Sequence, residues 1–297
     1  RNVRRFSSIA IVGILPAEEE SEEKDIHSYC GVPGRDGDGI LMGMAAGADT
    51  FRLGAVMPNC SEIYGPAVPE EHILRNMIGY IPMVQVNQSG RRFTDENLPA
   101  RDFVAVGECA AGQKRMCNIV DIEFLRNQEK GVIVGTCGAI AEGTPFPGGI
   151  DAVEEAVTGG EWAVYKADTL EELASQIDVD PEALCETIAH YNEMCEAGED
   201  TEFYKDSAYM IPIKTPPFYA ARVVTGLLAT IGGLRIDERM RVLDPDQNVI
   251  KGLYALGGDA GGMYGHMYDV AVASGAQQGF CAIGARYAIQ DIMESLS

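Results

Sequence analysis

The sequence predicts a mixed α/β fold, and three patterns along the chain support this class. Residues 253–256 are apolar and lead into the glycine-rich stretch 257–262, which a long helical pattern follows from about 275 to 295. A strand, a glycine-rich turn and a helix in this order are typical of a ligand-binding α/β domain. Apolar and polar residues alternate around 83–94, which predicts a hairpin, and apolar residues recur at helical spacing over 169–197.

The composition is that of a globular protein. The 297 residues are 46% hydrophobic, which is enough to fill one large domain or two ordinary ones. No run of about 18 apolar residues occurs, so we expect no transmembrane segment, and we do not interpret the start of the chain as a signal peptide. The net charge of -22 disfavours binding to nucleic acid or anionic lipid but is compatible with a basic redox partner. The composition does not indicate a cellular compartment.

The eight cysteines are scattered along the chain. They form no CxxC pair, and no set of histidines stands at the spacing of metal ligands. We therefore expect reduced, mostly buried thiols and no zinc, iron–sulfur or other metal site.

The first elements can be read in order from the amino terminus. Residues 9–12 are an apolar run that predicts a buried strand, and the acidic run 18–25 predicts a solvated loop or an exposed helix face. The glycine-rich stretch 36–39 precedes the pattern of small residues at 40–47. This order predicts a turn that opens a helix packed closely on a sheet.

Two linked helices follow in the second half of the chain. Asp168 or Thr169 can cap the first of them. Asp180 followed by Pro181 is a typical start for the second, which we expect to end near Gly198.

The last part of the chain returns to strands. A strand is expected at 234–237, and a polar hairpin is expected around Pro245 and Asp246, before the final strand, turn and helix.

Four segments in fixed order resemble a known family. Residues 37–48 resemble the glycine-rich helix of the FAD-dependent fumarate reductase and succinate dehydrogenase flavoproteins and of the related 3-ketosteroid dehydrogenases. Residues 86–96 resemble the hairpin at the entrance of their capping domain. Residues 230–237 and 249–257 resemble two further segments of the same proteins.

The resemblance implies the C-terminal part of a Rossmann-like FAD-binding domain with an inserted α+β capping domain. The FAD-binding domain would comprise residues 1–50 and 216–297, and the capping domain residues 51–215. The GxGxxG motif that holds the FAD pyrophosphate in this family is absent, since the stretch 132–143 has the wrong glycine spacing. We therefore expect an incomplete FAD-binding domain that another polypeptide could complete.

The resemblance also implies a proton donor. Arg101 follows the hairpin as the catalytic arginine does in fumarate reductases, and Asp102 is expected to orient it. An arginine has a high pKa, so this role requires confinement beside the substrate and a relay that returns the proton. An Arg–Asp surface pair at a loop end is the alternative interpretation.

A tyrosine distinguishes this chain from fumarate reductases. Tyr268 stands where they carry a substrate-binding arginine, and Leu228 and Ala229 stand where they carry a substrate-binding histidine, which argues against a dicarboxylate substrate. Residues 265–268 resemble instead the segment of ketosteroid dehydrogenases whose tyrosine polarises a substrate carbonyl. Tyr268 is therefore expected in the catalytic site. The alternative is that it is an interior tyrosine whose hydroxyl is hydrogen-bonded within the protein. His266 is expected to be structural.

FAD contacts are implied at two turns. The turn at 257–259 would approach the pyrophosphate and ribitol, and the start of the last helix would offer backbone amides to flavin N1 and O2. Ordinary capping of that helix is the alternative. The expected FAD-binding residues are Gly232, Gly257, Gly258, Asp259, Ser274, Gly275 and Ala276.

These features together predict an FAD-dependent oxidoreductase of carbon–carbon double bonds. It would pass a hydride from flavin N5 to an enone, enoate or similar small unsaturated molecule, with Arg101 as the proton donor. Two alternatives stay open, namely dehydrogenation of the ketosteroid type and a non-catalytic binding or assembly module. The expected partners are the small unsaturated substrate and a redox partner or completing polypeptide.

Overall fold

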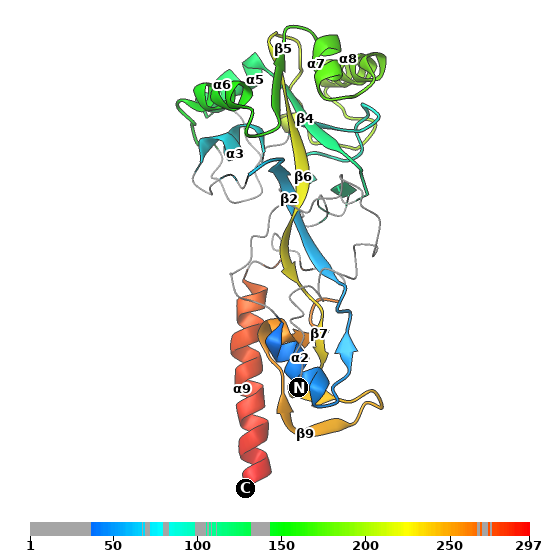
Figure 1. Ribbon diagram of the computed structural model, residues 1–297, viewed down its shortest axis with the longest axis vertical. Coiled ribbons are helices and arrows are strands. Elements are labelled where there is room, and N and C mark those ends of the chain that lie inside the picture. The colour runs from blue at the N-terminus through cyan, green and yellow to red at the C-terminus, as the bar shows by residue number, and fades with distance from the viewer. Residues whose placement is uncertain are drawn as a thin grey trace. The chain divides into compact units, whose positions relative to one another are not determined.

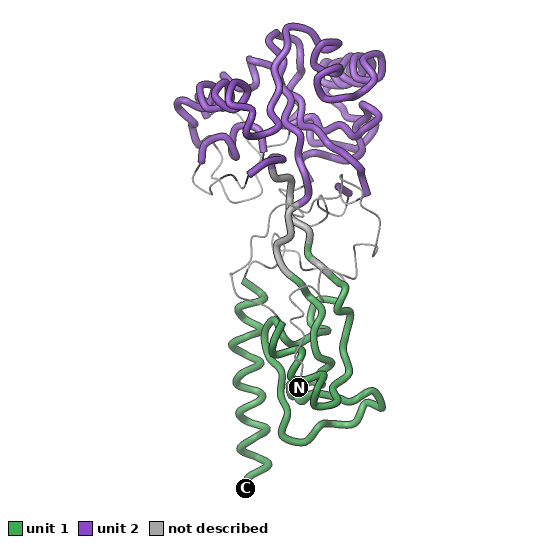
Figure 2. The backbone as a smooth tube through the Cα atoms, in the orientation of Figure 1, with its two compact units in different colours: residues 1–21, 30–57, 227–297 green, residues 22–29, 58–226 purple. Residues whose placement is uncertain are grey.

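The computed structural model describes residues 37–66, 68, 72–79, 83–98, 105, 107, 109–110, 112–131, 143–265, 268, 273 and 275–297. These residues divide into two compact units. Unit 1 comprises residues 37–57 and 227–297, and unit 2 comprises residues 58–226 (Figure 2). The chain passes from one unit to the other within strands β2 (Val56–Ile63) and β6 (Phe218–Thr230). The predicted domain boundaries lie several residues before these junctions and stay a prediction.

Unit 1 is built around a small mixed sheet. Its central strand, β7 (Gly233–Arg235), pairs antiparallel with β1 (Thr50–Phe51) and parallel with β10 (Ala260–Gly261). The hairpin of β8 (Arg241–Leu243) and β9 (Val249–Tyr254) follows β7. The remaining elements are helix α2 (Asp38–Ala45), the 3-10 turn η3 (Gly257–Asp259) and the long helix α9 (Ala276–Leu296).

Unit 2 is a five-stranded sheet with helices on both faces. The order β2, β6, β4 (Met116–Asp121), β3 (Val84–Asn87) is completed by β5 (Val164–Ala167), which also pairs with β6. The pairs β3–β4, β4–β6 and β5–β6 are antiparallel. Figure 1 shows α3 (Ile73–Ile78), α5 (Ile122–Glu129) and α6 (Gly149–Gly159) on one side, and α7 (Leu170–Gln176) and α8 (Pro181–Ala197) on the other.

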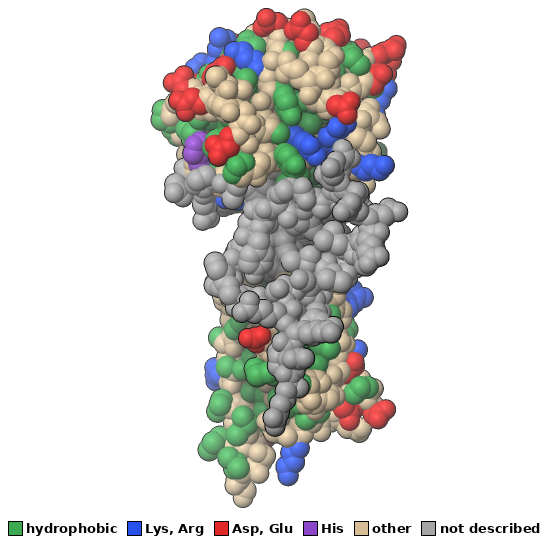
Figure 3. Space-filling model, in the orientation of Figure 1, with side chains coloured by type: hydrophobic (Ala, Val, Ile, Leu, Met, Phe, Trp, Pro, Cys, Tyr) green, Lys and Arg blue, Asp and Glu red, His purple; other side chains and the backbone are tan. Residues whose placement is uncertain are grey.

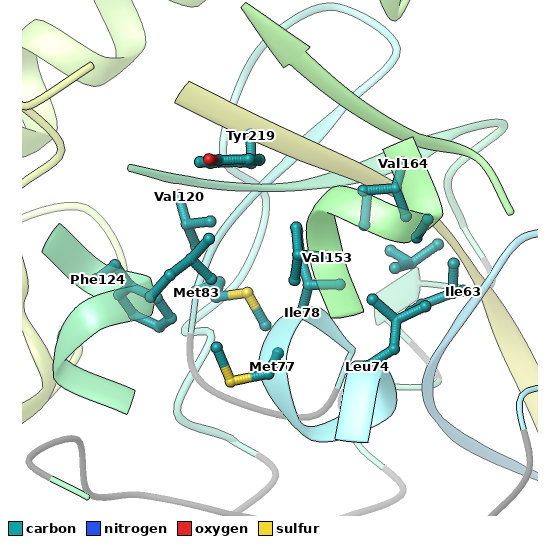
Figure 4. Packing of buried hydrophobic residues seen from close by; sticks show 14 of the residues in the cluster. Ile63, Leu74, Met77, Ile78, Met83, Val120, Phe124, Val153, Val164 and Tyr219 are labelled. Atoms are coloured by element: carbon teal, nitrogen blue, oxygen red, sulfur yellow. The ribbon is translucent and has the colours of Figure 1, made fainter. Parts of the chain in front are cut away.

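The two helix layers explain why the middle strands of unit 2 are buried on both faces. Along β4, Val120 packs into the core under α3, α5 and α6, whereas its neighbour Ile119 packs under α7 and α8. Side chains of a strand alternate between faces, so every residue of β4 is buried. Figure 4 shows the first of these cores, with Tyr219 of β6 facing Val120 and Phe124.

The predicted mixed α/β class is confirmed, and several local elements match the expectations. The side chains of Thr169 and Asp180 accept hydrogen bonds from the first turns of α7 and α8, and α8 ends at Gly198 in the left-handed conformation. The hairpin after β3 is shorter than its pattern suggests. It returns through a single bridge between Val86 and Arg92, and β3 pairs along its length with β4 instead.

The expectation of mostly buried cysteines is wrong for the part of the chain that the structure describes. Five cysteines are free thiols in this part of the chain. Cys117 is buried, Cys281 is exposed, and Cys109, Cys185 and Cys195 are partly exposed. Burial raises the pKa of Cys117 to about 12. The cysteine inside the sheet is thus buried, whereas those on helices are partly or fully exposed.

The acidic charge lies on the surface of unit 2. On the face seen in Figure 3, acidic side chains gather at the upper end, where Figure 1 places α7 and α8. These two helices and their connection expose Glu171, Glu172, Asp178, Asp180, Glu182, Glu186, Glu193 and Glu196. Within the described residues, no helix is long and apolar enough to cross a membrane.

Candidate flavin site in unit 1

Three glycine-containing segments that are far apart in the sequence meet in unit 1. A Cβ atom on Gly39 of α2 would lie 2.1 Å from Oδ2 of Asp259, and one on Gly43 would lie 2.2 Å from Cδ1 of Leu234. A Cβ atom on Gly233 of β7 would lie 2.6 Å from the carbonyl oxygen of Asp259 and 2.7 Å from the amide nitrogen of Gly261. Glycine at these positions therefore lets α2, β7 and η3 approach one another more closely than any other residue would allow.

Gly232 has a packing role of the same kind. A Cβ atom there would lie 2.0 Å from the carbonyl oxygen of Arg52 and 2.5 Å from its carbonyl carbon. The resemblance implied an FAD contact for Gly232. The structure gives this glycine a reason that does not involve a ligand, because it seats the start of β7 against the strand β1.

Other glycines of unit 1 face open space. A Cβ atom on Gly37, Gly258 or Gly279 would meet no atom of another segment within 4 Å among the residues that the structure describes. Bare backbone of this kind is what a phosphate or a flat ring needs for close approach, and Gly37 adopts a left-handed conformation before α2. Of the glycines predicted to contact FAD, Gly258 has such bare backbone, which fits the close approach of this cofactor.

The turn η3 is seated on α9. Gly257 has a φ of 60°, and a Cβ atom on it would lie 3.0 Å from Sγ of Cys281. Asp259, at the end of the turn, is exposed, and its carboxylate lies beside the first turn of α2. The positive end of a helix dipole favours a carboxylate there, so Asp259 has a local partner besides any ligand.

A backbone amide at the start of α9, expected to be available to FAD, already donates a hydrogen bond within the protein. Gly275 adopts a left-handed conformation as the N-cap residue, without a side-chain cap. The amide of Ala276 donates a hydrogen bond to the carbonyl oxygen of Ala273 at 3.0 Å, so this amide is already engaged. Further along, the buried carboxylate of Asp291 anchors α9, since it accepts hydrogen bonds from Arg239 and Tyr254, each at 2.8 Å. These two bonds lower the pKa of Asp291.

Tyr268, which lies between β10 and α9 in the sequence, forms an aromatic pair with Tyr264. Its hydroxyl donates to the carbonyl oxygen of Ala273 at 3.3 Å, and its ring centroid lies 4.6 Å from that of Tyr264. The hydroxyl of Tyr264 is buried and has no hydrogen-bond partner among the described residues. Burial raises the pKa of Tyr264 to about 12, with contributions from Tyr268 and Cys281. The sequence analysis missed Tyr264, although a second tyrosine four residues before Tyr268 in a glycine-rich stretch was a visible signal.

The structure does not bring together all of the predicted site residues. Gly232, Gly257, Gly258, Asp259, Gly275, Ala276 and Tyr268 all belong to unit 1. Arg101, Asp102, Ser274 and His266 lie outside the described residues.

Comparison with known proteins identifies the family of this chain. A family model described as an FAD binding domain matches residues 2–273. Vinyl phenol reductase of Lactiplantibacillus plantarum is 27% identical over 237 residues, which cover 78% of this chain and 48% of that protein. NADH:acrylate oxidoreductase of Vibrio harveyi is 34% identical over 239 residues, which cover 78% of this chain and 21% of that protein.

A solved structure extends the comparison to the fold. The 3-ketosteroid delta1-dehydrogenase from Sterolibacterium denitrificans is similar with a TM-score of 0.67 and 26% identity, and the match covers 91% of this chain and 50% of that one. The chain spans about half of the length of these proteins or less. Since the family model matches nearly the whole chain, the chain belongs to the FAD binding domain family, with relatives among fumarate-reductase-like and ketosteroid-dehydrogenase-like flavoproteins.

Proposed function

We propose that the chain is part of an FAD-dependent oxidoreductase that reduces the carbon–carbon double bond of an enone, enoate or similar small unsaturated molecule. The observation that carries the proposal is the meeting of α2, β7 and η3 through glycines in unit 1, with bare backbone left at Gly37 and Gly258. A relative named vinyl phenol reductase supports the direction of the reaction, and a relative named NADH:acrylate oxidoreductase supports a small unsaturated substrate.

The backbone around Gly257 and Gly258 and the start of α9 would hold FAD, together with polypeptide that carries the pyrophosphate site. Bound reduced FAD would supply the electron pair and one hydrogen to one carbon of the double bond. The residues of this chain then have two tasks, which are to deliver a proton to the neighbouring carbon and to bind the group that activates the double bond.

Arg101 is the proposed proton donor. The π bond of the substrate breaks, one carbon gains a hydride equivalent, and the other gains the proton that Arg101 gives up. A relay from solvent then returns a proton to Arg101, and Asp102 would orient its guanidinium. Tyr268 would exchange the hydrogen bond of its hydroxyl to Ala273 for one to the carbonyl or carboxyl oxygen on which negative charge develops.

The opposite direction is a second candidate. The solved structure similar to this chain is a ketosteroid dehydrogenase. The segment that contains Tyr268 also resembles such enzymes, and a tyrosine pair suits an apolar substrate with a single carbonyl. In this direction a base would remove the proton that Arg101 would otherwise deliver.

The experiment starts with the visible spectrum of the purified chain after addition of FAD. Flavin bands that stay with the protein support the proposal, whereas a protein that stays colourless favours a truncated or non-catalytic chain. Turnover with reduced viologen and an enone panel, compared with dye-linked oxidation of the saturated compounds, then gives the direction.

The role of Arg101 is tested with Arg101→Ala and Arg101→Lys. We expect both variants to keep the flavin spectrum and to lose 10²-fold or more in turnover, the usual range for removal of a general acid. Arg91→Lys is the matched control, because Arg91 is an exposed arginine of the preceding hairpin. Full turnover in Arg101→Ala would refute the assignment.

A further inference from the structure

Unit 1 has a much smaller hydrophobic core than unit 2. Among the residues that the structure describes, its core cluster has four buried members, which are Leu234, Val242, Ala255 and Ala260. Each of the two cores of unit 2 has sixteen or more. A small domain needs to bury much of its apolar surface to be stable, so unit 1 is short of such burial.

Apolar side chains are exposed on unit 1 instead. The described residues expose ten large hydrophobic side chains, and Tyr204 is the one among them that belongs to unit 2. Five of the other nine lie on helix α9. The nine are Met42, Met44, Val249, Met263, Ile283, Tyr287, Ile289, Met293 and Leu296. Exposed apolar residues that gather on one element mark an interaction surface.

One side of α9 packs on unit 1, along whose margin the helix runs in Figure 1. Its buried residues are Gly284, Ala288 and Asp291, which are spaced by four and three residues and so share one face. A Cβ atom on Gly284 would lie 3.1 Å from Sδ of Met240 and 3.5 Å from Cδ2 of Leu256. This face of the helix is therefore already covered by the residues that flank the β8–β9 hairpin.

A second face of α9 carries a continuous apolar stripe. Its members recur at spacings of three or four residues and are Ala282, Ala285, Ile289, Ile292, Met293 and Leu296. We call these six residues the α9 stripe. Ile289, Met293 and Leu296 are 60%, 63% and 78% exposed. A helix that is apolar on two faces is typical of a position between two packed layers, so the α9 stripe lacks a neighbour.

The sheet of unit 1 is small in the same way. Among the described strands it has the order β1, β7, β10, and both outer strands have two residues. The β7–β10 pair is parallel, and parallel strands occur almost always in larger sheets with helices on both faces. The sheet and the α9 stripe thus both indicate a domain of which unit 1 supplies one part.

The comparisons and the sequence indicate what the other part is. The chain spans about half of the length of its relatives or less, and it matches a family of FAD binding domains. Its sequence lacks the GxGxxG motif that holds the FAD pyrophosphate in this family. Such a motif stands between a strand and a helix, and a helix of this kind buries an apolar face.

We propose that the α9 stripe is the docking surface for a polypeptide that carries the GxGxxG pyrophosphate-binding segment of the FAD-binding domain. The inference rests on the proposed function for the choice of this partner. Surfaces that complete one another in this manner resemble a domain core cut in half. The α9 stripe has this character, because it is free of charged residues and belongs to a unit whose own core is small.

The test mixes the full chain with a separately expressed polypeptide that carries the strand, GxGxxG turn and helix of this family. Light scattering gives the mass of the complex, and a titration gives its affinity. Hydrogen exchange reports the protection of the amides of residues 282–296. These measurements are made without FAD, so that docking is tested apart from flavin binding. The visible spectrum after addition of FAD then reports whether the complex takes up flavin.

Two neighbouring residues of α9 provide matched variants. Ile289→Glu places a carboxylate within the α9 stripe, whereas Gln290→Glu adds the same charge to the same helix outside the stripe. Both positions are exposed in the chain alone, so both variants should keep the Tm of the parent within about 3 °C. Met293→Glu repeats the test at a second exposed position of the stripe.

We expect the parent and Gln290→Glu to form a one-to-one complex with the probe, with slower exchange over residues 282–296. Ile289→Glu and Met293→Glu should bind the probe at least tenfold more weakly, because docking would bury a carboxylate without a partner.

Three results would overturn the docking surface. The first is a parent chain that forms no complex, and the second is equal affinity in the parent and in both stripe variants. The third is a parent that is a dimer by itself and becomes a monomer in Ile289→Glu, since a second copy would then cover the stripe. A complex that needs the stripe but takes up no FAD would instead support the docking surface and refute the proposed function.

Discussion

Replacing Gly232 by alanine tests whether close packing explains this glycine. The new methyl carbon would lie 2.0 Å from the carbonyl oxygen of Arg52, 2.5 Å from its carbon and 2.7 Å from Cα of Leu53. All three neighbours are backbone or Cα atoms, so no side chain can rotate away. Relief requires a movement of about 1 Å between the start of β7 and strand β1, which is paired with it.

The size of the effect follows from this geometry. Extra carbon atoms in a well-packed interior usually cost about 1–3 kcal/mol, and contact with backbone favours the upper end of this range. In a domain of 60–100 residues, the approximate size of unit 1, this corresponds to a fall in Tm of about 10–20 °C. Calorimetry of Gly232→Ala is the assay.

Gly258→Ala is the control for this variant. A Cβ atom on Gly258 meets no protein atom within 4 Å, so the substitution should leave the Tm unchanged. If the backbone at Gly258 approaches FAD, the same substitution should weaken FAD binding. An unchanged Tm in Gly232→Ala, or an equal fall in both variants, would refute the packing explanation.

Two further predictions concern unit 2. Burial alone would raise the pKa of Asp200, but hydrogen bonds from Arg92 and backbone amides outweigh it and lower this pKa from 3.8 to about 2. The resulting stabilisation of roughly 2 kcal/mol is complete above about pH 4 and is lost as the pH falls toward 2. Urea unfolding at a series of pH values should therefore show a free energy of unfolding that falls over this range. An equal fall in Asp200→Asn would contradict the prediction. The hydroxyl of Tyr219 donates to Oε1 of Glu154 at 2.6 Å, so Tyr219→Phe should lower the free energy of unfolding by about 1–2 kcal/mol in the same assay, and no change would show that water replaces the bond.

Local elements of the fold could be predicted because their signals are local. Thr169 and Asp180 stand directly before their helices, and their side chains accept the hydrogen bonds that the first turns leave open. The 13 residues of β6 lacked such a signal. Its pairing with both β4 and β5 depends on segments 50–100 residues away, and sequence spacing carries no information on that register.

The candidate site was predictable to the extent that glycine marks close approach. The resemblance implied that Gly232 and Gly258 approach FAD closely. It could not show that Gly232 meets backbone while Gly258 meets open space, because this difference depends on the neighbour that each position receives in three dimensions. The partner of Arg92 was equally hidden, since Asp200 lies 108 residues further along the chain.

The tyrosine pair gives a physical reason to place carbonyl compounds ahead of dicarboxylates. A phenol with a pKa of about 12, as for Tyr264, stays protonated at physiological pH, so it offers a hydrogen-bond donor and no charge. Under the proposed function, the hydroxyl of Tyr268 would stabilise the partial charge on one carbonyl oxygen, and its ring would pack against apolar carbon. It cannot neutralise a carboxylate in the way that the arginine of fumarate reductases does, and the desolvation of an unpaired carboxylate costs more than a phenol hydrogen bond returns. In a chain of net charge -22, general electrostatic attraction offers no substitute for that arginine, so under the proposed function we expect an enone to be a better substrate than an enoate.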